Sequence, residues 1–272
     1  PGIALIIYGL VADVSIGKMF IAGLVPGLLC AVVLMFTVYL VARKTNAKPS
    51  RESWPTGKEV VFSLGQVWPA LFLIFAVVGG IRANIFTPTE AGAVAVLIVL
   101  AIGFFIYREM RISHVVKALG ETARATASVM LVIMASAALG WIFSMEHAGV
   151  AVANFVTSLT ENKYMFLLII NILLLTLGMF LEGNAILLIL VPLLKPVVEH
   201  FGIDPVHFGI IMIFNLSIGA FTPPVGTVML LVCNITQVSV GNFFKQSLPL
   251  LAALLLMLML VTYIPAISLF LV

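Results

Sequence analysis

The sequence is short of charge. Of its 272 residues only 9% are Asp, Glu, Lys or Arg, whereas 62% are hydrophobic. Soluble domains carry about a quarter charged residues and need a polar shell, so this composition excludes an ordinary soluble fold. The mean hydropathy is +1.24. Because apolar runs of roughly 20 residues recur along the chain, we predict a protein that crosses a lipid bilayer several times.

Residues that could hold a metal or form a disulfide are also scarce. The two cysteines, Cys30 and Cys233, lie inside apolar segments, and we interpret them as small buried side chains. The four histidines are scattered and lack the spacing of metal ligands. We therefore expect no cofactor and no resident metal site, and the net charge of +3 does not indicate a nucleic-acid partner.

Apolar and polar segments alternate along the chain. The segment 3–11 is too short to cross a membrane alone, and 108–124 is amphipathic, which predicts a helix lying in the membrane interface. The segment 43–58 is the long polar loop, and 146–163 is mildly amphipathic. The predicted crossings are residues 19–42, 66–86, 91–107, 125–144 and 248–270.

Residues 164–199 form an unusual pair of apolar arms, Tyr164–Leu181 and Ala185–Val198, around the polar tip Glu182-Gly183-Asn184. The pattern fits either two full crossings or the tip of a re-entrant hairpin. The next segment, 206–236, carries two prolines and several glycines within an apolar run. Proline inside a helix costs about 3 kcal/mol or more, and irregular backbone survives at membrane depth only in a cavity or against protein. We therefore predict a broken transmembrane helix.

Basic residues predict the orientation of the chain. When the crossings alternate from a cytoplasmic 43–58 loop, that loop, the segment 108–124 and Lys245 fall on one side. This side holds ten of the fourteen Lys and Arg residues, five in the loop, four in 108–124 and Lys245. The positive-inside rule supports this arrangement.

An internal repeat appears when the sequence is shifted by 224 residues. Each copy has a short apolar half-helix, a turn of the form Val-Ser-x-Gly and a long span. The two copies would have opposite orientations, and inverted repeats with broken helices are typical of secondary transporters. Because Pro1-Gly2 leads directly into apolar residues without an initiating Met, we expect a fragment that lacks about half of the protein. The identical pairs are Gly2 and Gly226, Val14 and Val238, Ser15 and Ser239, Gly17 and Gly241, Phe20 and Phe244, and Leu24 and Leu248.

Several motifs occur in order along essentially the whole chain. They are Phe86-Thr87-Pro88-Thr89-Glu90-Ala91-Gly92-Ala93, Gly178-Met179-Phe180-Leu181-Glu182, Gly202-Ile203-Asp204-Pro205-Val206-His207-Phe208-Gly209, Thr222-Pro223-Pro224-Val225-Gly226 and Tyr263-Ile264-Pro265-Ala266. Together they resemble the large membrane subunit of TRAP (tripartite ATP-independent periplasmic) transporters, in its C-terminal part.

This resemblance implies a fold, a function and partners. The fold would be an all-α, elevator-type transporter with inverted repeats, a re-entrant hairpin and broken transmembrane helices, in the bacterial inner membrane. The function would be uptake of a small organic acid, of the C4-dicarboxylate or sialic acid type, driven by sodium as the coupling ion. The partners would be a small four-helix membrane subunit and a periplasmic substrate-binding protein. The missing N-terminal half would carry its own part of the site, so this chain alone should not transport.

The resemblance also suggests a division of the chain. Residues 1–18 would end the first, truncated repeat, and 19–163 would form scaffold and arm helices around the cytoplasmic loop. Residues 164–240 would form the transport element, with the hairpin at 164–199 and the broken helix at 206–236. Residues 241–272 would form the final transmembrane helix.

The binding site is expected where the hairpin tip faces the break. Sodium prefers oxygen ligands, and unwound backbone supplies carbonyl oxygens. The resemblance places the ion near Gly219, Thr222 and Val225, with the Thr222 hydroxyl as a further ligand. Packing of small residues remains an alternative for the glycines, and Glu182 could instead sit in water or cap a helix N-terminus. The expected sodium- or substrate-binding residues are Gly183, Asn184, Asn215, Gly219, Thr222, Pro223, Pro224, Val225, Gly226 and Thr227, with Gly178 and Glu182 as secondary candidates.

Other functions remain as alternatives. The nearest is a related elevator family that carries dicarboxylates with sodium but without a binding protein. An intramembrane enzyme would need a nucleophile and a base at membrane depth, but the histidines lie at segment edges and neither aspartate lies mid-span. A channel would use symmetric rings of charges or carbonyls around one pore. We therefore expect a transporter rather than an enzyme.

Overall fold

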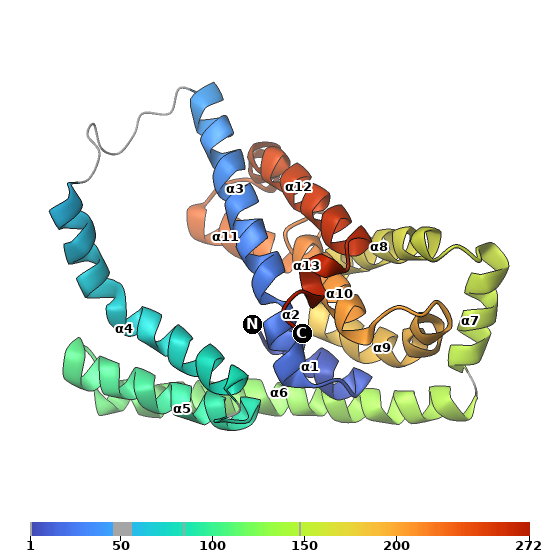
Figure 1. The fold of residues 1–272 in the computed structure, drawn as a ribbon, viewed down its shortest axis with the longest axis horizontal. Coiled ribbons are helices and arrows are strands. Elements are labelled where there is room, and N and C mark those ends of the chain that lie inside the picture. The colour runs from blue at the N-terminus through green and yellow to red at the C-terminus, as the bar shows by residue number, and fades with distance from the viewer. Residues whose placement is uncertain (1, 46–55, 84, 147) are drawn as a thin grey trace. The chain divides into compact units, whose positions relative to one another are not determined.

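The computed structural model describes residues 2–45, 56–83, 85–146 and 148–272 (Figure 1). Throughout this described part the chain forms helices and turns without a β-strand, and seven helices are long and apolar enough to cross a membrane. The predicted all-α polytopic fold is therefore confirmed. The centre of the predicted cytoplasmic loop, residues 46–55 with Lys48, Arg51 and Glu52, lies outside the described residues.

Contacts divide the chain into two units. The hairpin unit contains the described residues of 1–45 and 131–272, and the second unit contains those of 46–130. The contacts thus group α3, the first long span, with the hairpin. Which helices act as scaffold and which as transport element stays a prediction. The hairpin unit holds α1 (Ile3–Ala12), α2 (Ile16–Ala22), α3 (Leu24–Lys44), the end of α6 (Ile112–Met145), α7 (Ala148–Leu159), α8 (Lys163–Phe180), α9 (Gly183–His200), α10 (Pro205–Gly219), α11 (Thr227–Thr236), α12 (Val240–Tyr263) and α13 (Ala266–Leu269); the second unit holds α4 (Gly57–Arg82), α5 (Pro88–Ala101), the π-helix η1 (Ile102–Ile106) and the start of α6.

Three predicted boundaries are wrong. The crossing predicted at 66–86 corresponds to α4, which begins earlier, at Gly57, and ends at Arg82. The amphipathic segment 108–124 and the crossing 125–144 form one continuous helix, α6. Its interior has no proline, and Gly120 alone does not end a helix, because one glycine costs only about 1 kcal/mol. The final span was predicted at 248–270, but α12 begins at Val240 and ends at Tyr263. The first turns of α12 are polar, so the search for apolar runs did not include them. At the other end, Pro265 prevents the helix from continuing.

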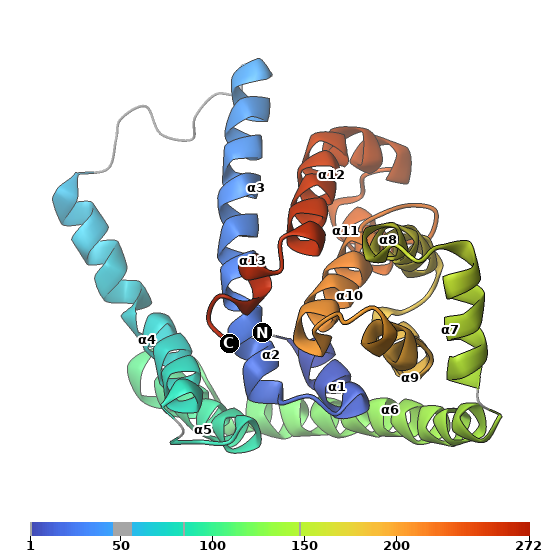
Figure 2. The same ribbon diagram turned by 45° about the vertical axis from the view of Figure 1, so that its right-hand side comes forward.

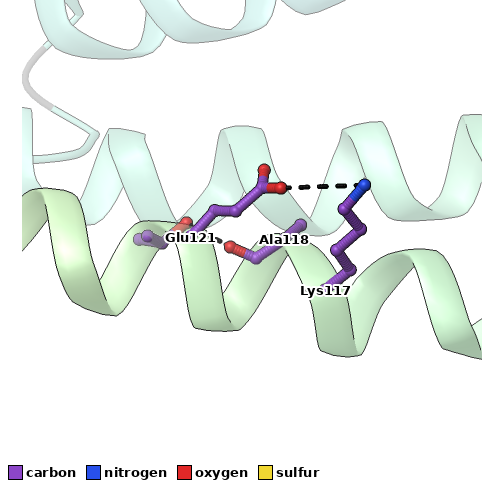
Figure 3. Close-up of polar contacts among 4 residues, drawn as sticks. Lys117, Ala118 and Glu121 are labelled. Carbon is purple, nitrogen blue, oxygen red and sulfur yellow. Dashed lines mark hydrogen bonds and ion pairs between the residues drawn. The ribbon is translucent and has the colours of Figure 1, made fainter.

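The first half of α6 is amphipathic, as predicted. On one face Lys117 and Glu121 form an i,i+4 ion pair of 3.9 Å between highly exposed side chains (Figure 3), and such a pair adds little stability. On the other face the exposed apolar side chains are Ile112, Val116 and Leu119. The placement of this helix in the membrane interface stays a prediction.

The repeat at offset 224 is visible in the backbone. Helices α1 and α11 both have ten residues at matched positions, and both end in a left-handed residue, Asp13 with φ 60° and Gln237 with φ 56°. The next helix begins after Ser15 in one copy and after Ser239 in the other. Helices α3 and α12 pack together and run in opposite directions (Figures 1 and 2). The two copies are therefore inverted.

Helix α10 lies at the centre of the hairpin unit, where it contacts α1, α2, α8, α9, α12 and α13 (Figure 2). Its side chains Phe208, Ile211 and Met212 are buried. A Cβ atom at Gly209 would collide with the ring of Tyr8, so glycine is required for the approach of α1. The Tyr8 hydroxyl donates to the Pro205 carbonyl at 2.7 Å and joins α1 to the start of α10.

Removing this hydroxyl should weaken the hairpin unit. In the full-length protein, Tyr8→Phe is expected to cost about 1 kcal/mol, because the hydrogen bond that joins the buried Tyr8 side chain to the start of α10 is lost. A lower midpoint of thermal unfolding in detergent would show this. Tyr263→Phe is the matched control, since its hydroxyl donates to the Tyr164 carbonyl at 3.3 Å in an exposed position. Equal midpoints for the two variants would contradict the prediction.

Candidate ion and substrate site

The hairpin tip and the helix break lie side by side. The hairpin consists of α8 and α9, and the break comprises residues 220–226 between α10 and α11. The Gly226 N–H donates to the Met179 carbonyl at 3.1 Å, which ties the break to the end of α8. A Cβ atom at Gly183, at the start of α9, would lie 3.5 Å from the Leu216 Cβ of α10. The two predicted halves of the site are therefore in contact.

Two glycines allow α8 and α10 to cross closely. A Cβ atom at Gly219 would lie 2.7 Å from both the Cα and the carbonyl carbon of Gly178. In the opposite direction, a Cβ at Gly178 would lie 3.3 Å from the Gly219 Cα. Real Cβ atoms do not approach backbone at 2.7 Å, so the crossing requires glycine at Gly219. Close packing, the alternative considered from the sequence, thus explains these two glycines at least in part.

The break leaves backbone oxygens open. Within the part of the chain that the structure describes, the carbonyls of Thr222 and Val225 accept no hydrogen bond. The Gly219 carbonyl accepts one, from the Thr222 N–H at 2.9 Å, and therefore keeps a lone pair. The peptide bond between Pro223 and Pro224 is cis, and Gly226 has φ +42°, which favours glycine.

The side chains of the break differ in exposure. Thr222 is half-buried, and its hydroxyl donates to the Ile218 carbonyl at 2.8 Å, which leaves the hydroxyl oxygen able to accept or to ligate. Pro223 is half-buried, whereas Pro224, Val225 and Thr227 are exposed. Thr227 opens α11, but the next two N–H groups, of Val228 and Met229, already donate to the Ala220 carbonyl.

The polar tip is organised as a helix cap. One carboxylate oxygen of Glu182 accepts from the Ala185 N–H at 3.0 Å, and the other accepts from the Asn184 side-chain amide at 2.6 Å. Glu182 is the N-cap of α9, so the capping interpretation given from the sequence is confirmed. The negative Glu182 carboxylate therefore lies at the N-terminus of α9 and stabilises the partial positive charge there.

Asn215 belongs to a buried polar chain that the sequence interpretation missed. Its amide nitrogen donates to the Asn171 side-chain oxygen at 2.7 Å and to the Ile211 carbonyl at 2.8 Å, and the Asn171 amide donates to the Thr262 hydroxyl at 3.0 Å. All three side chains are buried. The Asn215 Oδ1 atom is buried and has no partner among the described residues. Asn171 could have been noticed in the sequence, because it interrupts an apolar arm.

Breaking this chain at its centre should be costly. In the full-length protein, Asn171→Ala is expected to destabilise the fold by about 1–3 kcal/mol, because it removes two buried hydrogen bonds and leaves the Thr262 hydroxyl without its partner, while Asn215 keeps its bond to the Ile211 carbonyl. Thermal unfolding in detergent would measure the change. Thr176→Ala is the control on the same helix, since its exposed hydroxyl donates only to the Ile172 carbonyl. An Asn171→Ala midpoint no lower than that of the control would contradict the prediction.

The chain is similar to known proteins over nearly its whole length. Residues 1–267 match the model of the family described as the DctM component of the tripartite ATP-independent periplasmic transporter. The chain is 40% identical over 273 residues to the C4-dicarboxylate TRAP transporter large permease protein DctM of Pseudomonas aeruginosa, covering 99% of this chain and 62% of the relative. It is 39% identical over 275 residues to the sialic acid TRAP transporter large permease protein SiaM of Vibrio cholerae, covering 100% and 63%.

A more distant relative extends the range of named substrates. The 2,3-diketo-L-gulonate TRAP transporter large permease protein YiaN of Escherichia coli is 32% identical over 266 residues, covering 97% of this chain and 62% of the relative. The chain thus spans 62–63% of the length of these three relatives.

Proposed function

Because the chain belongs to the family of the DctM component of tripartite ATP-independent periplasmic transporters, we propose that it is the C-terminal part of a permease subunit for sodium-coupled uptake of small organic acids. The observation that carries this proposal is the open backbone of the break beside the hairpin tip. The carbonyls of Thr222 and Val225 accept no hydrogen bond from any described residue. Open carbonyls at membrane depth need a ligand, and sodium provides one.

The coupling ion would bind within the break. Its ligands would be the carbonyl oxygens of Gly219, Thr222 and Val225 and the Thr222 hydroxyl, all neutral oxygen donors suited to a hard cation. Asn215 Oδ1, one helical turn before Gly219, is a further neutral oxygen on the same helix. Gly183 and Asn184 would close the site from the tip, and Gly178 would allow that approach.

The substrate would be a small organic acid. The three relatives are named for a C4-dicarboxylate, sialic acid and 2,3-diketo-L-gulonate, all of which carry a carboxylate. We assign the carboxylate to the start of α11, beside the Thr227 hydroxyl. The Val228 and Met229 N–H groups already donate to the Ala220 carbonyl, so the attraction there would come from the partial positive charge of the helix N-terminus. The cation in the break would add to this attraction, which couples the ion to the acid.

Transport would proceed by an elevator motion in the bacterial inner membrane. Residues 164–240 would form the mobile transport element, and the second unit, residues 46–130, would belong to the scaffold. A periplasmic binding protein would deliver the acid, and a small four-helix subunit would join the scaffold. Exposed apolar side chains on α4, such as Val61, Phe62 and Phe75, would face lipid or that subunit.

Uptake into proteoliposomes tests the proposal. The full-length permease is reconstituted with its small subunit and binding protein, and a labelled organic acid is supplied under an inward sodium or potassium gradient. Sodium-driven accumulation is expected, and equal uptake under both gradients would overturn the coupling. A further arm omits the binding protein. Full uptake without it would favour the related binding-protein-independent family instead.

A further inference from the structure

A second polar cluster lies at the other end of α10. His207, in the first turn of that helix, is buried, with 3% of its surface exposed. Its Nδ1 lies 2.6 Å from the Ser268 hydroxyl of α13, and its Nε2 lies 3.3 Å from the Thr262 carbonyl of α12. The proposed site residues Asn215 and Gly219 lie further along the same helix.

The hydrogen bonds around His207 can satisfy two protonation states. Nε2 must carry a proton, because the Thr262 carbonyl can only accept. The Ser268 hydroxyl has one proton, which it can donate either to His207 Nδ1 or to the Pro265 carbonyl, 3.1 Å away. In the first case the ring is neutral. In the second, Nδ1–H donates to the Ser268 oxygen and the ring is a cation, so rotation of one hydroxyl accommodates both states.

Charged and titratable groups around His207 come from several elements. A cavity of about 180 Å³ is lined by His207 together with Lys163 and Tyr164 of α8, Asp204 before α10 and Tyr263 of α12. The Asp204 carboxylate accepts from the His207 backbone N–H at 3.1 Å and contributes negative charge, which offsets the positive end of α10. His207 is the buried ring at the wall of this cavity. The other titratable groups of the neighbouring elements are Tyr8 on α1, which donates to Pro205, the exposed Lys18 on α2, the exposed Lys195, Glu199 and His200 on α9, and the exposed Lys245 at the opposite end of α12; α13 has none.

We propose that His207 is a positioning residue that binds a proton in competition with the coupling ion, so that acid pH weakens sodium binding at the break. This inference rests on the proposed function. By the helical rise, His207 lies ~12 Å from Asn215 and ~18 Å from Gly219 along α10. At an effective dielectric constant of about 20, a unit charge at these distances changes the binding constant of a cation about fivefold to tenfold.

A polar chain joins the two ends of the helix. Thr262 accepts from His207 through its carbonyl and from Asn171 through its hydroxyl, and Asn171 accepts from Asn215. Asn215 Oδ1 is the unpartnered atom at the inner end. The dipoles of these groups can reorient when the ring becomes charged, which carries the effect of the proton toward the break.

The geometry argues against a catalytic Ser268–His207 pair. The distance of 2.6 Å fits an activated nucleophile, but Ser268 is only 1% exposed and cannot meet a substrate carbonyl. The second ring nitrogen faces a backbone carbonyl rather than a carboxylate. A role in positioning and in proton binding accounts for both contacts.

Sodium binding can be measured without transport. The full-length permease with its small subunit, purified in detergent, is titrated with sodium from pH 5 to pH 8.5, and the sodium-dependent rise in Tm gives the apparent Kd, with potassium as the ionic control. The wild-type Kd should weaken about fivefold to tenfold as the pH falls toward 5 and the ring gains its proton. His207→Gln should remove this dependence, because the amide can donate to Thr262 and accept from Ser268 but cannot titrate.

Two further variants make the test decisive. His200→Gln changes an exposed histidine outside the cluster and should keep the wild-type pH profile. Ser268→Ala removes the acceptor of the charged ring, so the transition should move to lower pH; it decides the question if His207→Gln does not fold. Sodium binding with the same pH profile in wild type, His207→Gln and Ser268→Ala would overturn the inference alone. No sodium-dependent rise in Tm at any pH would instead overturn the proposed ion site.

Discussion

Gly219→Ala is expected to abolish most uptake and to destabilise the hairpin unit. The added Cβ would lie 2.7 Å from the Gly178 backbone, which has no flexible side chain that could move away. Helices α8 and α10 would have to separate, at a cost of about 1–3 kcal/mol for overpacking. The separation would also pull the Gly219 carbonyl away from the tip. Uptake by the full-length complex and thermal unfolding in detergent would measure the two effects.

Alanine variants of two other glycines serve as comparisons for Gly219→Ala. Gly178→Ala should have a smaller effect, since its Cβ would meet the Gly219 Cα at 3.3 Å. Gly241→Ala, in the same unit, places its Cβ in open space and should behave like wild type or be slightly more stable. Wild-type uptake and stability in Gly219→Ala would mean that the crossing of α8 and α10 is loose and does not shape the site.

The break and the tip were predictable because their causes are local. Proline lacks an N–H wherever it stands, so Pro223 and Pro224 predict an interrupted helix from the sequence alone. An acid at the polar tip, Glu182, predicts a helix start in a similar way, because a negative charge is stabilised at a helix N-terminus. The repeat was also predictable, because the Val-Ser-x-Gly turns match in sequence. In the structure, a residue with a left-handed backbone precedes each turn, Asp13 in one copy and Gln237 in the other.

The buried polar chain was not predictable because its partners are distant in sequence. Asn171 and Thr262 are separated by 91 residues, and His207 and Ser268 by 61. Their contacts depend on how α8, α10, α12 and α13 pack, and no periodicity in one helix encodes that packing. The contact of Gly178 with Gly219 is of the same kind. The sequence shows that both residues are small, but only the fold shows that a Cβ atom at Gly219 would collide with the backbone of Gly178.

Thr222→Ala should weaken sodium coupling more than any other side-chain truncation in the break. The hydroxyl donates to Ile218, and its oxygen is the side-chain ligand we assign to the ion. Losing one such ligand should raise the sodium concentration for half-maximal uptake about tenfold to a hundredfold, since an interaction with a charged group contributes about 1.5–3 kcal/mol. Uptake at saturating sodium should remain, because the carbonyls of Thr222 and Val225 belong to the backbone. Thr222→Ser keeps the hydroxyl and should restore coupling.

Thr37→Ala separates loss of an ion ligand from loss of a helix contact. Its hydroxyl is also half-buried and also donates to the carbonyl four residues earlier at 2.8 Å, but it lies on α3. Both variants remove a methyl group, a hydroxyl and one i−4 hydrogen bond, so any general effect on stability should be shared. Only Thr222→Ala should change the sodium dependence of uptake. If both variants shift it equally, the hydroxyl acts through the helix; if neither does, the ion lies outside the break and the open carbonyls of Thr222 and Val225 need another partner.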